Sequence, residues 1–159
     1  MKAISLLLLA ASTTFASPAI IPMPLEMELG GGFLPLTGQA AISFVGDGAR
    51  QPAELLATQL RPATGFDLAV ENGEKGTIVF RLVEDESLGD EGYVLSVTDH
   101  VSISAPTAKG LFYGAQTLRQ LLPPQIFSGT GVDLDWKVPK VEIRDVPRFG
   151  WRGMHLDVA

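Results

Sequence analysis

Residues 93–122 read YVLSVTDHVSISAPTAKGLFYGAQTLRQLL. The apolar residues in this stretch recur first with the two-residue period of a strand and then with the period of a helix, and these two periods predict the fold class. Apolar and polar residues alternate on either side of Asp99 and His100, which predicts a β-hairpin with a tight turn. After the hairpin the apolar residues follow the helical period until Pro123 and Pro124. The stretch therefore predicts two paired strands followed directly by a helix.

Two glycines, Gly110 and Gly114, lie inside this predicted helix. Each of them lowers helix stability by about 1 kcal/mol relative to alanine. A glycine inside a helix often permits the close approach of another part of the chain. We therefore expect this face of the helix to pack tightly against a sheet.

The alternation typical of strands and the apolar stripe typical of a helix also occur toward the N-terminus. Alternating apolar residues predict strands within residues 42–45, 66–70 and 78–82. Between the first two strands, an apolar stripe predicts a helix that Pro52 opens and Pro62 closes. The chain before these elements is rich in proline and glycine, which predicts an extended segment with a turn.

One more strand closes the layer. A loop is predicted over residues 125–138, followed by the strand VEIRDV, which turns Val141 and Ile143 inward. This order of elements predicts an α+β fold, in which a mostly antiparallel sheet carries two helices on one face. After Pro147, residues 151–158 have the apolar content of a further strand, outside this layer.

Acidic residues are concentrated in two places. Residues 84–92, EDESLGDEG, favour a solvated loop over a calcium site, because the alternating oxygen ligands and the glycine at the sixth position are missing. Asp133 and Asp135, beside Trp136, could serve acid–base chemistry or sugar stacking. A loop with a packed tryptophan is favoured, because carboxylates in a flexible segment lack the support that tuned pKa values require.

The composition fits one globular domain and argues against two classes of partner. The 159 residues are 46% hydrophobic, and the formal net charge of −6 with scattered basic residues disfavours nucleic-acid binding. His100 and His155 have no partner at metal-ligand spacing, so no metal or other cofactor is expected. The chain has no cysteine, so its stability depends on the core rather than on disulfides.

Residues 1–17 have the composition of a secretory signal peptide. A lysine precedes the apolar run of residues 3–11, and small residues surround an expected cleavage site near Ala16. The apolar run is too short to span a bilayer, which disfavours a membrane anchor. The mature protein is therefore expected to be secreted or periplasmic.

Four segments together resemble the family 20 glycoside hydrolases, the β-N-acetylhexosaminidases. They are IIPMP at residues 20–24, EGYVLSV at 91–97, ISAPTAKGLFYGAQTLRQLLP at 103–123 and IRDVPRFGWRGMHLDVA at 143–159. The resemblance implies that residues 18–146 form the small α/β domain that precedes the family's TIM barrel. Residues 147–159 would then be the beginning of that barrel, truncated after its first strand, in the front portion of a longer enzyme.

The resemblance also implies a mechanism whose residues lie elsewhere. In this family the 2-acetamido carbonyl of the sugar attacks its own anomeric carbon, a glutamic acid protonates the leaving oxygen and a neighbouring aspartate orients the acetamido group. Both residues come from an Asp-Glu pair on a later strand, which no segment of this chain matches. Asp90 and Glu91 have the same order but lie in the acidic loop. We therefore assign no catalytic residue.

Arg152 and Asp157 are the candidate substrate-binding residues. Asp157 would lie toward the C-terminal end of the first barrel strand, the face on which barrel active sites are built. The alternative, which we favour for both, is a structural role through buried hydrogen bonds or an ion pair. The expected partner is an N-acetylhexosamine-containing oligosaccharide, bound through the barrel.

Three functions follow from these observations. The first is a supporting domain of a β-N-acetylhexosaminidase, and the second is a stand-alone carbohydrate-associated or structural module with the same layer. The third is the small domain of another family, such as glycoside hydrolase family 84. The motif RGMHLDV at residues 152–158 favours family 20, because family 84 typically has R-G-x-x-E-G-F-Y-G at this point.

Overall fold

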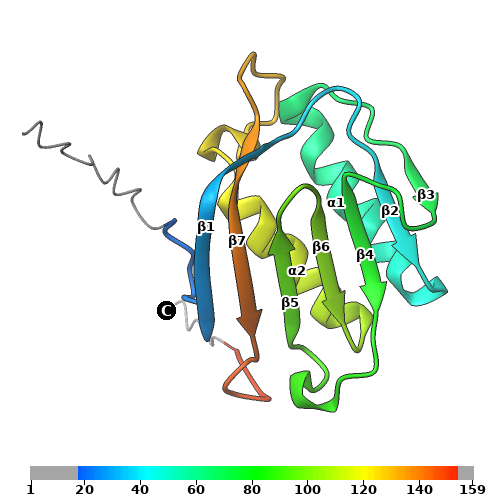
Figure 1. Cartoon of the computed structure of the whole chain (residues 1–159), viewed down its shortest axis with the longest axis vertical. Helices are drawn as coiled ribbons and strands as arrows, with labels where there is room; N and C mark the ends of the chain where they lie inside the picture. Colours follow the sequence, from blue (N-terminus) through cyan, green and yellow to red (C-terminus); the bar gives the residue numbers. More distant parts are fainter. Residues whose placement is uncertain (1–17, 154–159) are drawn as a thin grey trace, which may run out of the picture.

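Seven strands form one sheet, and two helices cover one of its faces (Figure 1). These elements come from a computed structural model, which describes residues 18–153. In chain order they are β1 (Glu26–Pro35), β2 (Ile42–Val45), α1 (Asp47–Thr64), β3 (Val70–Asn72), β4 (Ile78–Leu82), β5 (Tyr93–Val97), β6 (Val101–Ala105), α2 (Ala108–Leu121) and β7 (Lys137–Asp145). Two short 3-10 helices, η1 (Glu86–Leu88) and η2 (Pro124–Phe127), lie in the connections. The predicted α+β class, with two helices on one face, is confirmed.

The sheet is mixed rather than mostly antiparallel. Its strand order is β1-β7-β5-β6-β4-β2-β3. Neighbouring strands are antiparallel from β1 to β6 and parallel from β6 to β3. Strands β2 and β3 are parallel because α1 connects them, and such a crossover returns the chain in the same direction. Strand β4 also runs parallel to both of its neighbours, β2 and β6. Alternation in the sequence indicates a strand but not its direction.

Helix α1 extends beyond both prolines that we expected to bound it. Pro52 and Pro62 lie inside the helix, although a proline removes one backbone hydrogen bond there. The helix ends instead before Gly65, which has a left-handed φ of 69° and donates its N–H to the carbonyl of Arg61. The side chains of the predicted apolar stripe are fully buried, which offsets the cost of the prolines. They are Ala53, Leu56, Ala57 and Leu60.

The predicted hairpin and the helix after it are confirmed. β5 and β6 pair antiparallel, with Leu95 opposite Ile103, and α2 follows from Ala108 to Leu121. A β-carbon placed on Gly114 would lie 2.6 Å from Cγ2 of Ile103, too close for any side chain. Helix α2 therefore lies so close to the sheet that only glycine fits at position 114, and the close packing that the sequence predicted is confirmed.

The proline- and glycine-rich segment forms most of β1. Its pairing with β7 is interrupted between Leu29 and Phe33, where the glycine run lies. Gly32 has a φ of 87°, in the left-handed region that favours glycine. The predicted turn is therefore a bulge within an edge strand.

The N-terminal arm (residues 18–25) lies against α2 and the end of β7. Both the N–H and the carbonyl of Ile21 hydrogen-bond the side chain of Gln120, on α2. The N–H of Leu25 donates to Oδ1 of Asp145 over 3.1 Å. The arm thus joins the first and last strands of the layer to the helix.

Candidate functional site

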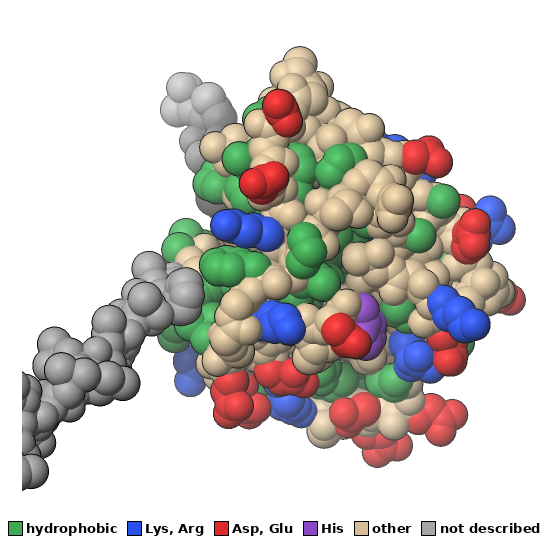
Figure 2. Space-filling view, turned by 45° about the horizontal axis from the view of Figure 1, so that its top comes forward, with side chains coloured by type: hydrophobic (Ala, Val, Ile, Leu, Met, Phe, Trp, Pro, Cys, Tyr) green, Lys and Arg blue, Asp and Glu red, His purple; other side chains and the backbone are tan. Residues whose placement is uncertain are grey.

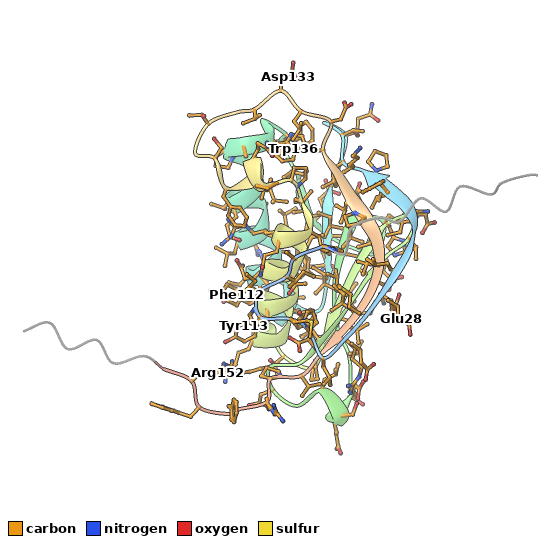
Figure 3. The ribbon with its side chains drawn as sticks, turned by 90° about the vertical axis from the view of Figure 1, so that its left-hand side faces the viewer. Glu28, Phe112, Tyr113, Asp133, Trp136 and Arg152 are labelled. Atoms are coloured by element: carbon orange, nitrogen blue, oxygen red, sulfur yellow. The ribbon has the colours of Figure 1, made fainter. Side chains whose placement is uncertain are left out.

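The chain leaves the sheet after Asp145 and continues as the exit segment (residues 146–153). This segment contains Arg152, one of the two candidate binding residues. Figure 3 shows Arg152 below Phe112 and Tyr113 of α2, at the opposite end of the molecule from Trp136. Arg152 is therefore remote from Asp133, which Figure 3 places at the end that contains Trp136.

The guanidinium of Arg152 binds three oxygen atoms. Its Nη2 donates to Oε2 of Glu91 over 2.6 Å and to the hydroxyl of Tyr113 over 3.2 Å. Its Nη1 donates to the carbonyl of Phe149 over 2.7 Å. The guanidinium carbon also lies 5.5 Å from the centroid of the Tyr113 ring, within the range of a cation–π interaction.

The pair of Arg152 and Glu91 is charge-assisted and partly shielded from solvent. The side chains are 41% and 25% exposed, respectively. The hydrogen bond to Glu91, and after it the one to Tyr113, raises the pKa of Arg152 above its ordinary value. Arg152 is thus a fixed cation whose nearest countercharge belongs to the same chain.

The acidic loop holds Glu91 in place from both of its ends. Leu88, at the end of η1, is 1% exposed, so the loop that we predicted to be solvated has one side chain in the core. The hydroxyl of Thr107, which caps α2, hydrogen-bonds the carbonyl of Asp90. The loop is therefore attached to the core on one side of Glu91 and to the helix beside it.

The other sequence candidates do not come together with Arg152. Asp157 lies outside the described residues. Asp133 and Asp135 are exposed, whereas Trp136 is buried, which confirms the interpretation of a loop with a packed tryptophan. Trp151, at the start of the expected last strand, is 85% exposed.

Sequence reasoning missed the partners of Arg152. Glu91 and Tyr113 lie 61 and 39 positions away from it, and no local pattern connects such distant residues. In the sequence, Glu91 is notable only as part of an adjacent Asp-Glu pair, to which we assign no catalytic role. Only the fold brings the three side chains together.

A groove of about 740 Å³ at the edge formed by β1 and β7 was also missed. Its lining is mostly apolar and includes the glycine run of β1, Phe33 and the prolines after α2. Nζ of Lys137 lies 4.9 Å from the centroid of the Phe33 ring. The bulge in β1 opens this groove, because glycines carry no side chains to fill it.

The described part of the chain contains neither a cluster of candidate metal ligands nor a helix that could span a membrane. Among residues 18–153, no group of three or more His, Cys, Asp or Glu residues could hold a metal ion. No helix in the same range is long and apolar enough to cross a membrane. On the face shown in Figure 2, basic side chains lie among acidic ones.

Comparison with known proteins identifies the family. The sequence model for glycosyl hydrolase family 20, domain 2, matches residues 17–146. The chain belongs to glycoside hydrolase family 20. The β-hexosaminidase of Porphyromonas gingivalis is 38% identical over 144 residues, which are 88% of this chain and 18% of that protein.

Two further relatives are also matched over most of this chain but over a small part of their own length. The β-N-acetylhexosaminidase of Cellulomonas fimi is 36% identical over 148 residues, 89% of this chain and 28% of that enzyme. The structure of the N-acetyl-β-hexosaminidase of Streptomyces plicatus, in complex with Thio-NAglucal, matches 84% of this chain at 40% identity and a TM-score of 0.80, and 27% of that chain. This family 20 chain thus spans less than a third of each of these relatives.

Proposed function

We propose that this domain supports the catalytic barrel of a β-N-acetylhexosaminidase. Such an enzyme removes terminal N-acetylhexosamine residues from oligosaccharides, of chitin type or derived from peptidoglycan, by substrate-assisted hydrolysis. The observation that carries the proposal is the match of residues 17–146 to a domain of family 20, whose relatives are β-hexosaminidases. The domain contributes support, and the chemistry belongs to the barrel.

The arrangement of Glu91 supports this division of roles. A general acid must present a proton to the leaving oxygen. The carboxylate of Glu91 instead accepts a hydrogen bond from Arg152 over 2.6 Å, as one half of an ion pair. The described range has two adjacent Asp-Glu pairs, Asp85-Glu86 and Asp90-Glu91, and both lie in the acidic loop. Asp85 caps η1 through Ser87 and Glu91 pairs with Arg152, so we expect the 159-residue chain to be inactive.

A domain exchange tests the proposal. Residues 18–146 replace the matching domain of the Streptomyces plicatus enzyme, and hydrolysis of a chromogenic β-N-acetylglucosaminide is measured. We expect kcat/KM to stay within about tenfold of the parent enzyme, a cost of about 1.4 kcal/mol. The control is the same graft with Ile103→Asp, which places a charge in the core and should abolish a folded product.

Two outcomes would count against the proposal. One is a folded graft without activity, while the parent enzyme lacking the domain remains active, because the domain would then give no support. The other is hydrolysis by the 159-residue chain alone, because the chemistry would then lie within it. Either result is distinguishable from a graft that fails to fold, which circular dichroism detects.

We also propose that the protein is secreted or periplasmic. The support is the composition of residues 1–17, a lysine followed by an apolar run and small residues. These residues lie outside the described range. Mass spectrometry of the protein expressed in a Gram-negative host should show an N-terminus close to Ser17, and an intact Met1 in the mature fraction would contradict the proposal.

A further inference from the structure

Three segments that are distant in the sequence meet at Arg152. Glu91 comes from the loop before β5, Tyr113 from α2 and Arg152 from the exit segment. We propose that these three side chains form a junction clamp, which holds the exit segment against the layer and fixes the direction in which the chain leaves it. Arg152 is then a positioning residue rather than a sugar-binding one.

The hydrogen-bond donors of Arg152 support this role. A guanidinium has five N–H donors, and an arginine that grips a ligand usually presents two of them as a parallel fork. Here both Nη2 donors are directed to Glu91 and Tyr113, and one Nη1 donor is directed to Phe149. The terminal fork is therefore already occupied by groups of the same chain.

Tyr113 provides a rigid platform for the guanidinium. Its ring is in edge-to-face contact with the ring of Phe112, with centroids 5.5 Å apart and planes at 68°. Arg152 thus meets both the face of the Tyr113 ring and its hydroxyl. A platform on a helix is more precise than one on a loop, because packing restricts its side-chain rotamers.

The bond to Phe149 extends the clamp along the exit segment. Arg152 donates to the carbonyl of Phe149, three residues earlier, so this hydrogen bond joins the two ends of residues 149–152. Within this stretch Trp151 is 85% exposed and Phe149 is 65% exposed. The segment is thus held by Arg152 and its partners rather than by burial of its aromatic side chains.

Cleavage by chymotrypsin after Phe149 tests the clamp in the 159-residue chain. The main variant is Glu91→Gln, which removes the countercharge and leaves the cleaved sequence unchanged. We expect its cleavage rate at Phe149 to rise several-fold over wild type. Asp90→Asn is the matched control, since it removes one charge from the neighbouring exposed residue and should cleave at the wild-type rate.

Additional variants separate a clamp from a general loosening. Arg152→Ala should accelerate cleavage at least as much as Glu91→Gln, because it also removes the contacts with Tyr113 and Phe149. The double variant should cleave no faster than Arg152→Ala, because the ion pair is already lost in that variant. Arg148→Ala is the charge control within the segment. Salt of about 0.5 M should accelerate cleavage of the wild type but not of Glu91→Gln, because screening weakens an ion pair that is partly open to solvent.

The inference fails if Glu91→Gln cleaves no faster than Asp90→Asn, or if the effects of Glu91→Gln and Arg152→Ala multiply. Far-UV circular dichroism of each variant confirms that the sheet is intact. The readout requires no enzymatic activity and concerns contacts within residues 18–153 alone. Failure of the clamp is therefore distinguishable from failure of the proposed function.

Discussion

At the scale of single residues, Tyr93 places a phenol in the core, where it is 2% exposed. Its hydroxyl lies 2.6 Å from the hydroxyl of Thr117, which is also buried. Burial is the main reason that the pKa of Tyr93 is raised to about 12. The two hydroxyls thus form a hydrogen bond with each other where water is excluded. This bond connects β5, which contains Tyr93, to α2, which contains Thr117.

Replacing Tyr93 by phenylalanine should destabilise the protein at neutral pH. The Thr117 hydroxyl would lose its partner in the core, at a cost of about 1 to 2 kcal/mol. The raised pKa adds a pH dependence. The folded state keeps the phenol proton, so its stabilising contribution is present below the unfolded pKa of 10.0 and is lost as pH rises through about 12.

The measurement is the free energy of unfolding in urea, for wild type and Tyr93→Phe, from pH 7 to pH 12. The stability of the wild type relative to Tyr93→Phe should fall by about 2 to 3 kcal/mol over the alkaline range, since each pKa unit corresponds to about 1.4 kcal/mol. Tyr93→Phe should therefore become the more stable protein near pH 12. Thr117→Val in the Tyr93→Phe background should recover part of the neutral-pH loss. A constant difference between the two proteins at all pH values would contradict the burial of the phenol.

The site itself could be predicted from the sequence only in part. Arg152 was identifiable because it lies in a family motif at the end of the domain. Its partners were not, because long-range side-chain contacts depend on the strand order, which alternating apolar residues do not reveal. Asp157 stays a prediction, since it lies outside the described residues.

At the scale of elements, the N-terminus of α2 depends on Thr107. The Thr107 hydroxyl oxygen accepts hydrogen bonds from the N–H of Lys109 over 3.1 Å and of Gly110 over 3.4 Å. The same hydroxyl donates to the carbonyl of Asp90. One side chain therefore caps the helix and fastens the acidic loop to it.

Thr107→Ala should lower the free energy of unfolding by about 1 to 2 kcal/mol, as loss of a helix cap usually does. Thr107→Ser retains the hydroxyl and should stay close to wild type. Urea unfolding at pH 7 compares the three proteins. Equal stabilities of the alanine and serine variants would show that the cap contributes nothing.

The elements that the sequence predicted well are those whose signals are local. The hairpin of residues 93–105 and helix α2 have clear periods, a tight turn and a proline stop, and both are confirmed. Helix α1 was predicted too short because a buried apolar stripe outweighed two prolines. The parallel half of the sheet was missed because the connections between strands set their directions, and alternating apolar residues do not reveal them.

At the scale of the whole molecule, stability should be highest in the middle of the sheet. The hairpin of β5 and β6 lies between β7 and β4, so its backbone is paired on both sides. Hydrogen exchange should show residues 93–105 opening only with global unfolding. Residues 149–153 should exchange rapidly, because the hydrogen bonds described for them use the Arg152 side chain and the Phe149 carbonyl rather than backbone N–H groups. Similar protection of both segments would contradict this order.

The hydrogen bond between Leu25 and Asp145 has a consequence for how such a domain can be part of a larger protein. It places the start of β1 beside the end of β7, so the two covalent connections of the layer adjoin at one corner (Figure 1). A unit of this kind can be carried as one cassette within a larger protein, because ends that lie close together in space can join neighbouring parts of that protein without splitting the core. The two curated relatives, in which the matched region is 18% and 28% of the protein, differ in how much other sequence accompanies this cassette.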